Sequence, residues 1–252
     1  MAMFHECPKV LWAVNSENPV SFNASMKLSS ESGLVLKDAD GSTVWSTNVS
    51  SKSVASLNLT GRCNLMLLDD KSATVWQSFD HPTNTLVLGQ KLVAGQQLIS
   101  TGGLYSLSLT SEGLSTYINS NPSQHYFSFP EGTDNTNFSY ALFTIEGVTL
   151  VSWTEDSNHS IAITSKLGVY SQYMRFEPDG HLKVYAFNWS VVFDLLTKVI
   201  GTCHYLMVCS NYGICTVRNT EVRHGSERAR QRSSDVVSAR ARYSASVLER
   251  AT

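Results

Sequence analysis

One tryptophan-ended phrase occurs twice in this chain. GLVLKDADGSTVW ends at Trp45 and NLMLLDDKSATVW ends at Trp76, so a single constant offset relates the two copies, which we call the tryptophan repeat. A fainter third copy, VLWAVN, carries Trp12 about one period upstream. Besides the tryptophans, the positions kept between the full copies are Leu34 and Leu65, Leu36 and Leu67, Asp38 and Asp69, Thr43 and Thr74, and Val44 and Val75. Such a period indicates repeated units, each too small to bury its apolar face alone.

Each full copy predicts a β-hairpin. An apolar run, a polar turn and a second apolar run follow one another, and Asp40-Gly41 is a strong signal for a tight turn. The second copy has Lys71 and Ser72 at these places, so its turn is less ideal. Because the fainter copy lacks its first part, we expect the repeat to begin upstream of Met1, which makes the first unit N-terminally truncated.

The middle of the chain predicts a second set of strands. LYSLSL, LSTYI, VTLVSW and HLKVYAF are strand-like runs, and one wider offset leads from Leu114 to Val148 and again from Val148 to Leu182. Each residue of this wider repeat follows a polar or glycine-bearing turn. No segment shows a convincing helical apolar period. We therefore predict an all-β sandwich, barrel or prism, with one unit in residues 1–90 and another in residues 91–190.

Composition narrows the class of protein. Charged residues make up 16% of the chain, against a globular norm of about 25%, and Ser, Thr and Asn take their place. This balance is typical of β-rich extracellular domains, and the net charge of −2 argues against a nucleic-acid partner. We find no apolar run of about 18 residues that would predict a membrane span. MAMFHECPKV lacks the basic start and unbroken apolar core of a signal peptide.

Sequons and cysteines bear on the compartment. Six Asn-x-Ser/Thr sequons occur, at Asn23, Asn48, Asn58, Asn137, Asn158 and Asn188. They favour secretion and glycosylation, although a Ser-rich chain also produces sequons by chance. Cys203, Cys209 and Cys215 follow a C-x5-C-x5-C spacing, which fits no paired zinc ligands and is typical of a small disulfide module. For Cys7 and Cys63 a structural free thiol is the simpler interpretation.

Residues 218–252 differ in kind from the rest. They hold eight of the ten arginines and none of the nine lysines, with the basic cluster RARQR at 228–232. Three interpretations stay open: a basic tail that binds nucleic acid or anionic lipid, a solvated tail, or a segment from a shifted reading frame or retained intron. The abrupt switch from lysine to arginine favours the third origin, and we expect this tail to be disordered.

Four stretches together resemble a known family. They are VLWAVNSENPV, GLVLKDADGSTVWSTN, NLMLLDDKSATVWQSFDHPTNTLVLGQ and YMRFEPDGHLKVYAFN. They look like the bulb-type lectin domains of plants, and more narrowly like the ectodomain of G-type lectin S-receptor-like serine/threonine kinases and related secreted glycoproteins. The resemblance implies an extracellular or cell-surface location and two tandem β-prisms, each with three four-stranded sheets. It also implies that Trp12, Trp45 and Trp76 pack in the middle, and that residues 191–217 begin a cysteine-rich, EGF-like region.

The sequence lacks the catalytic motifs that would predict an enzyme. The receptors carry a transmembrane helix and a kinase domain further along, but this chain has no kinase glycine-rich loop, His-Arg-Asp or Asp-Phe-Gly motif. It also has no hydrolase elbow, zinc-protease motif or phosphate loop. We therefore expect no enzyme activity, no catalytic residue, no cofactor and no metal site.

Mannose binding in the parent lectins uses the pattern Q-x-D-x-N-x-V-x-Y. Side chains two apart on a strand point the same way, so the pattern gathers donors and acceptors for sugar hydroxyls. The best match here is Glu177, Asp179, His181, Lys183 and Tyr185. It keeps the Asp and the Tyr of the pattern. Of the degenerate copies, the first keeps only Val35, with Glu31 as a partial substitute for the Asp, the second keeps only Asn64, and the third keeps only Tyr117.

Two functions are compatible with this pattern. The first is a lectin ectodomain with weak mannose-type binding at residues 177–185, whose partners would be glycans or glycoproteins. The second is a sugar-silent interaction module that binds a second copy of itself or a receptor. In that case the polar residues are only the solvent face of a half-buried strand whose alternate residues are Phe176, Leu182 and Val184.

Overall fold

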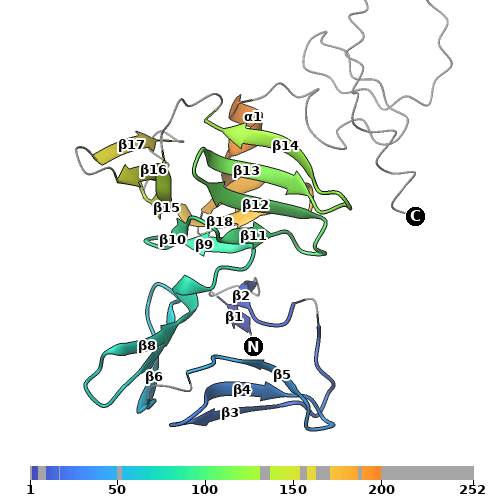
Figure 1. The fold of residues 1–252 in the computed structure, drawn as a ribbon, viewed down its shortest axis with the longest axis vertical. Helices are drawn as coiled ribbons and strands as arrows, with labels where there is room; N and C mark the ends of the chain where they lie inside the picture. The colour runs from blue at the N-terminus through green and yellow to red at the C-terminus, as the bar shows by residue number, and fades with distance from the viewer. Residues whose placement is uncertain are drawn as a thin grey trace, which may run out of the picture.

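The structure is a computed structural model that describes residues 2–4, 10–16, 18–49, 53–130, 137–153, 158–162, 171–186 and 189–199. Cys7, Asn188, the three cysteines of residues 191–217 and the tail of 218–252 lie outside these ranges, so what the sequence predicts for them stays a prediction. The described chain forms two bodies of antiparallel strands, one above the other in Figure 1.

The first body contains three small sheets. One pairs β1 (Ala2–Phe4) with β2 (Val10–Ala13), the next contains β3 (Ser25–Ser29), β4 (Gly33–Lys37) and β5 (Thr43–Ser46), and the third contains β6 (Ser56–Leu59), β7 (Leu65–Leu68) and β8 (Thr74–Gln77). The 3-10 turn η1 (Ser78–Asp80) leads out of this body.

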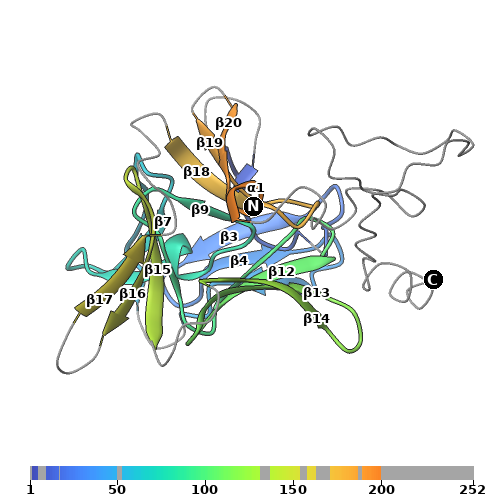
Figure 2. The ribbon, with the colours of Figure 1, turned by 90° about the horizontal axis from the view of Figure 1, so that it is seen from above.

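The second body contains three four-stranded sheets. Across the first sheet the order is β20 (Val191–Asp194), β19 (Leu182–Ala186), β18 (Ser171–Phe176) and β9 (Thr85–Val87). Across the second it is β10 (Lys91–Val93), β15 (Phe138–Thr144), β16 (Gly147–Trp153) and β17 (Asn158–Ala162). Across the third it is β11 (Gln97–Ile99), β12 (Tyr105–Thr110), β13 (Gly113–Ile118) and β14 (Gln124–Phe129). The short helix α1 (Leu195–Val199) follows β20. Figure 2 shows the three sheets facing different directions around a common middle. The predicted all-β fold is confirmed, and three sheets around one core are the architecture of a β-prism.

Strand pairing places the limits of the second body outside the predicted range of 91–190. β9 lies before this range, yet it pairs with β18 through Val87 and Tyr173. β20 lies after it and pairs with β19, and Leu195 and Leu196 of α1 are buried in the same core. Strands of three or four residues carry too little alternation for the sequence to assign them to a sheet.

The tryptophan repeat is a structural repeat. Leu36 faces Trp45 across β4 and β5, and Leu67 faces Trp76 across β7 and β8. Both predicted hairpins are therefore confirmed, with the same register in each copy. The corresponding apolar positions of β4 and β7 are buried in one shared core.

Smaller features recur with the same offset. The hydroxyl of Thr47 accepts a hydrogen bond from the backbone N–H of Leu34 at 3.1 Å, and at the matching place in the next copy Ser78 does the same for Leu65 at 2.9 Å. The second turn departs from the ideal as predicted, because Ser72 holds φ at +62° where the first copy has a glycine. A residue with a Cβ is strained in this left-handed region.

The three tryptophans meet inside the first body, as predicted. The ring centroids of Trp12 and Trp45 are 6.2 Å apart, and each is 5.9 Å from that of Trp76, with the rings edge to face. The indole N–H of Trp12 donates to the carbonyl of His81 at 2.8 Å, and the His81 ring stacks on Trp76 at 5.2 Å. Because each tryptophan comes from a different sheet, the cluster joins all three.

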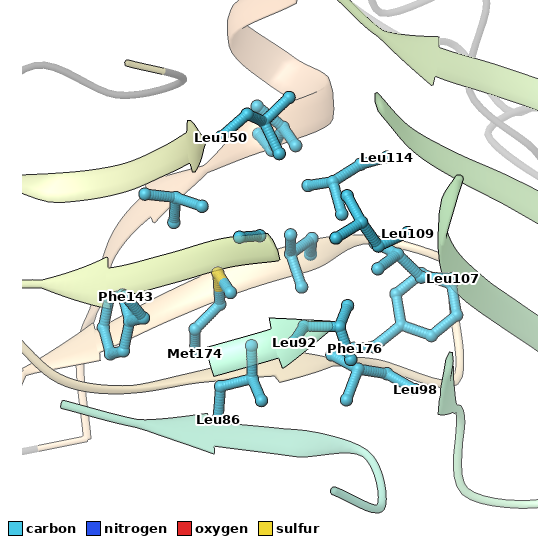
Figure 3. Packing of buried hydrophobic residues seen from close by; sticks show 14 of the residues in the cluster. Leu86, Leu92, Leu98, Leu107, Leu109, Leu114, Phe143, Leu150, Met174 and Phe176 are labelled. Atoms are coloured by element: carbon cyan, nitrogen blue, oxygen red, sulfur yellow. The ribbon is translucent and has the colours of Figure 1, made fainter. Parts of the chain in front are cut away.

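The wider repeat also corresponds to structural equivalence. Leu114, Val148 and Leu182 lie at the start of β13, β16 and β19, one strand from each sheet, and all three are 2–3% exposed. Figure 3 shows Phe143 and Phe176 in the core that these sheets enclose, and neither has any exposed surface. The weaker sequence repeat is thus the three-sheet symmetry of the second body.

The first body has fewer strands per sheet than the second among the described residues. β3 and β6 form sheet edges there. The side chains of Met26, Leu28, Leu57 and Leu59 share the face of the core-forming residues but are 38–55% exposed. These apolar edge strands are available for pairing with a further strand.

Replacing Trp76 with alanine should lower the free energy of unfolding by about 3–5 kcal/mol, because it removes the ring that contacts both other tryptophans. Urea unfolding followed by circular dichroism measures the change. The control is Leu59→Ala on the same sheet, whose side chain is 55% exposed and should cost under about 1 kcal/mol. Similar losses in the two variants would contradict a tryptophan-centred core.

Gly33→Ala should be more destabilising than Gly41→Ala. Both glycines have positive φ, +65° and +86°, so both substitutions carry the backbone strain of that region. Only at Gly33 would the new Cβ also lie 2.3 Å from Thr47 Oγ1 and 2.7 Å from Val49 Cγ2. Overpacking should add about 1–3 kcal/mol to the loss measured by urea unfolding. Equal losses would show that this contact relaxes freely.

Candidate functional site

The candidate residues lie on the hairpin that joins β18 to β19. Phe176, Leu182 and Val184 point into the core of the second body and are at most 3% exposed. Lys183 and Tyr185 therefore belong to the outer face, because side chains alternate along a strand. On this face Tyr185 is directly opposite Tyr173 of β18, and the two rings stack with centroids 4.9 Å apart.

The turn of this hairpin is closed by its own polar groups. The N–H of Glu177 donates to the carbonyl of His181 at 2.9 Å, and the N–H of Gly180 donates to the carbonyl of Glu177 at 3.0 Å. A carboxylate oxygen of Asp179 accepts from the N–H of His181 at 3.0 Å. Gly180 takes a φ of +77°, which only glycine adopts without strain. The sequence Glu-Pro-Asp-Gly-His thus builds the turn that carries the candidate site.

Four of the five candidate side chains form two pairs. The hydroxyl of Tyr185 donates to Glu177 Oε1, and Lys183 Nζ donates to Asp179 Oδ2. The fifth, His181, is 8% exposed and places its Nδ1 2.8 Å from Asp194 Oδ2. The structure therefore brings Glu177 to Tyr185 and Asp179 to Lys183, whereas the imidazole of His181 turns to β20.

Burial and the neighbouring Glu177 carboxylate both raise the pKa of the Tyr185 hydroxyl. Burial raises the pKa of Tyr185 above its usual value, and the hydrogen bond to Glu177 raises it further because ionisation would place two negative charges together. Burial likewise raises the pKa of Tyr173 to about 12. Tyr185 is therefore a neutral donor at physiological pH.

This arrangement offers mixed hydrogen-bonding chemistry on one surface. Two carboxylates present acceptors, and an ammonium and a phenol present donors, which are the groups that sugar hydroxyls require. The internal pairs do not exhaust them, because a carboxylate accepts about four hydrogen bonds and an ammonium donates three. A ligand would have to share these groups rather than find them unpaired.

The degenerate copies have structural roles. The amide N–H of Asn64 donates to Gln77 Oε1 at 2.9 Å, and its carbonyl oxygen accepts from Ser78 Oγ at 3.2 Å and from the N–H of Phe79 at 3.3 Å. Asn64 is also 7% exposed, so it fixes the exit of the first body.

The other retained positions do not form a comparable polar set. Glu31 is exposed in the turn between β3 and β4, and Val35 is half-buried in β4. The Tyr117 ring meets the edge of His125 at 5.4 Å.

Asp194 and Arg175 were not predicted from the sequence. Asp194 lies in a strand of the region taken as cysteine-rich, and only the pairing of β20 with β19 brings it beside His181. Arg175 projects from β18, and its guanidinium lies over the Tyr173 ring with its centre 5.2 Å from the ring centroid. The alternation of β18 could have indicated that Arg175 shares a face with Glu177.

The structure describes five of the six sequon asparagines and one of the five cysteines. Asn23, Asn48, Asn58 and Asn137 are exposed, and Asn158 is a residue of β17. Cys63 is a free thiol as predicted, and burial raises its pKa. Within the described ranges, no group of three or more His, Cys, Asp or Glu side chains could hold a metal ion. No helix in the same ranges has the length and apolar character needed to cross a bilayer.

Comparison with known proteins finds a family match for the first part of the chain. Residues 9–108 match the family model described as D-mannose binding lectin. The match is to a D-mannose binding lectin domain and spans 100 of the 252 residues. The lectin match covers the first body from β2 onward and continues through β9, β10 and β11 into β12 of the second.

Two curated relatives of this chain are plant proteins. It is 28% identical over 221 residues to a G-type lectin S-receptor-like serine/threonine-protein kinase of Arabidopsis thaliana, covering 83% of this chain and 25% of the kinase. It is also 28% identical over 253 residues to the epidermis-specific secreted glycoprotein EP1 of Daucus carota, covering 81% of this chain and 65% of the glycoprotein. The chain thus spans a quarter of the first relative and less than two thirds of the second.

Two solved structures are more distant. A Japanese Marasmius oreades lectin is 21% identical, with a TM-score of 0.36, and the match covers 45% of this chain and 91% of that one. A monomeric monocot mannose-binding lectin from Gastrodia elata is 16% identical, with a TM-score of 0.33, and the match covers 44% and 94% of the two chains.

Tyr185→Phe should reduce the loss of stability at high pH. The raised pKa of Tyr185 means that the folded state holds this proton more tightly than the unfolded state, where the pKa is near 10.0. Its contribution is present below that value and is lost as pH rises above it. Urea unfolding at about pH 9 and about pH 11 should show a smaller fall for the variant than for the wild type. Identical falls in the two proteins would contradict this assignment.

Proposed function

We propose that this chain is a carbohydrate-binding lectin ectodomain fragment with weak affinity for mannose-type glycans. The observation that carries the proposal is the polar set on the β18–β19 hairpin, where Glu177, Asp179, Lys183 and Tyr185 form two adjacent pairs on the outer face. The match of residues 9–108 to the D-mannose binding lectin family model supports the same class of ligand. We assign no catalytic residue to the chain.

The affinity should be low. Only Asp179 and Tyr185 match the mannose pattern, and Glu177 and His181 replace a Gln and an Asn. Each lost hydrogen bond to a sugar hydroxyl costs about 0.5–1.5 kcal/mol, whereas a millimolar site has only about 4 kcal/mol in total. His181 is further committed to Asp194. Any mannose binding should therefore depend chiefly on the side chains of Asp179 and Tyr185.

The remaining lectin copies should not bind mannose. Asn64 is engaged on both sides of its amide, and it is the only residue of the pattern kept in that copy. Loss of its partners would leave buried polar atoms unpaired, at a cost of about 1–3 kcal/mol each. The second hairpin of the first body is therefore a structural derivative of a sugar site.

An extracellular setting and two tandem lectin units are part of the proposal. The relatives are described as receptor-like kinases and a secreted glycoprotein, and four of the sequon asparagines are exposed. The three-sheet second body supports a second lectin-like unit. Glycans or glycoproteins would be its partners.

A second candidate function is a sugar-silent interaction module. The pairs Glu177–Tyr185 and Asp179–Lys183, together with His181–Asp194, already satisfy one another. Such a face can be the solvated side of a stable hairpin with no ligand at all. Its partner would be a second copy or a receptor protein.

Titration of the full chain with methyl α-mannoside and with oligomannose separates the two functions. We expect saturable calorimetric binding in the millimolar range, abolished by Asp179→Ala. The matched control is Asp69→Ala, which removes a turn carboxylate that accepts from the N–H two residues on, as Asp179 does, but in the first body. A flat titration of folded wild type would favour the sugar-silent module, and binding that survives Asp179→Ala would overturn the assignment of the sugar site to this hairpin.

A further inference from the structure

A cavity of about 290 Å³ lies where the two bodies meet. Its walls come from the first body, from the loop after β9, from the turn between β15 and β16, and from β18 and the end of β19. The residues that matter for the argument are Leu11, Arg62, Val87, Ile145, Tyr173 and Trp189. We propose that this cavity binds a small amphiphilic carboxylate, one acid group on an aromatic or branched aliphatic body.

The walls are fixed by packing between the bodies. Leu11 of β2, Val87 of β9 and Tyr173 of β18 are buried in one cluster, with Trp189 packed against it. Arg175 connects the two bodies, because its Nε donates to Thr85 Oγ1 at 3.0 Å and its Nη2 donates to the carbonyl of Val10. The cavity therefore lies beside a small apolar core to which both bodies contribute residues.

Arg62 is an exposed residue that places a positive charge beside this cavity. Among the described residues it makes no ion pair and no hydrogen bond, and it lines the cavity from the first body. Its Nη1 lies 3.1 Å from the position that a Cβ would take on Gly89, so the absence of a side chain there leaves room for the guanidinium. A guanidinium binds a carboxylate through two parallel hydrogen bonds, which makes this anion its natural partner.

Tyr173 adds a second, independent indication of a ligand. Its side chain is 3% exposed, and its hydroxyl is buried with no hydrogen-bond partner in the described part of the chain. Buried polar groups without a partner are uncommon and call for an explanation such as a bound molecule. Because this hydroxyl has almost no exposed surface, a polar atom of a ligand in the cavity that Tyr173 lines would satisfy it only after a small shift of the ring.

The other residues that line the cavity favour a ligand with an apolar skeleton. Leu11, Val87 and Ile145 are aliphatic, and Trp189 is aromatic. A sugar carries hydroxyls on every side and would leave several of them unpaired here, which costs free energy. The volume is near the lower end of the range of about 300–1,000 Å³ for ligand pockets, so a single ring with a short acidic arm fits.

Phenylacetate is a suitable probe for the full chain, and phenylacetamide is its uncharged match. Calorimetry should show saturable millimolar binding of phenylacetate and at least about tenfold weaker binding of phenylacetamide, which corresponds to the loss of one charged hydrogen bond. Methyl α-mannoside should not compete, because the hairpin site is separate. No saturation by folded wild type, or equal binding of acid and amide, would overturn the proposal.

Two variants test the residues. Arg62→Gln should weaken phenylacetate about tenfold, whereas the control Lys27→Gln, an exposed cation on β3 outside the cavity, should leave it unchanged. Tyr173→Phe should weaken binding about threefold or more while the urea midpoint stays the same or rises, because the hydroxyl has no protein partner to lose. An affinity indifferent to Arg62→Gln would rule out the carboxylate assignment.

Discussion

Edge-to-face packing of Trp12, Trp45 and Trp76 is the contact on which the first body depends. Each tryptophan belongs to a sheet of only two or three strands, and a sheet of that size is marginal on its own in water. The three rings give these sheets a common apolar centre. The second body solves the same problem with four-stranded sheets and a core rich in leucine and phenylalanine side chains, in which Leu114, Val148 and Leu182 occupy equivalent places.

The sequence predicted the parts of the fold that repeat. The tryptophan repeat and the wider repeat identified the hairpins, the tryptophan cluster and the symmetric core positions, because equivalent positions in a three-sheet body face the same packing demand. The sequence did not predict that β9 and β20 join the sheet of β18 and β19. Val87 and Asp194 belong to short strands, and the pairing of such strands depends on partners elsewhere in the chain. Nothing in a local pattern shows which sheet such a strand joins.

The sequence predicted which side chains of the β18–β19 hairpin share a face, but not how they pair. Alternation correctly separated Leu182 and Val184 from Lys183 and Tyr185, because period 2 fixes the face of each side chain. It could not show that His181 turns to Asp194, which depends on a strand later in the chain. The internal pairs give the polar residues of this hairpin a structural role whether or not a sugar binds there.

The seam between the bodies has a consequence for how this chain could have been assembled in evolution. The stretch that matches the lectin family ends at residue 108, inside β12, whereas β9 is already a strand of the second body. A fragment cut at that family boundary would separate β9 from β18 and leave Val87 without Tyr173. The two bodies are therefore interlocked rather than modular, and neither could be shuffled into another protein at this boundary without exposing an apolar surface.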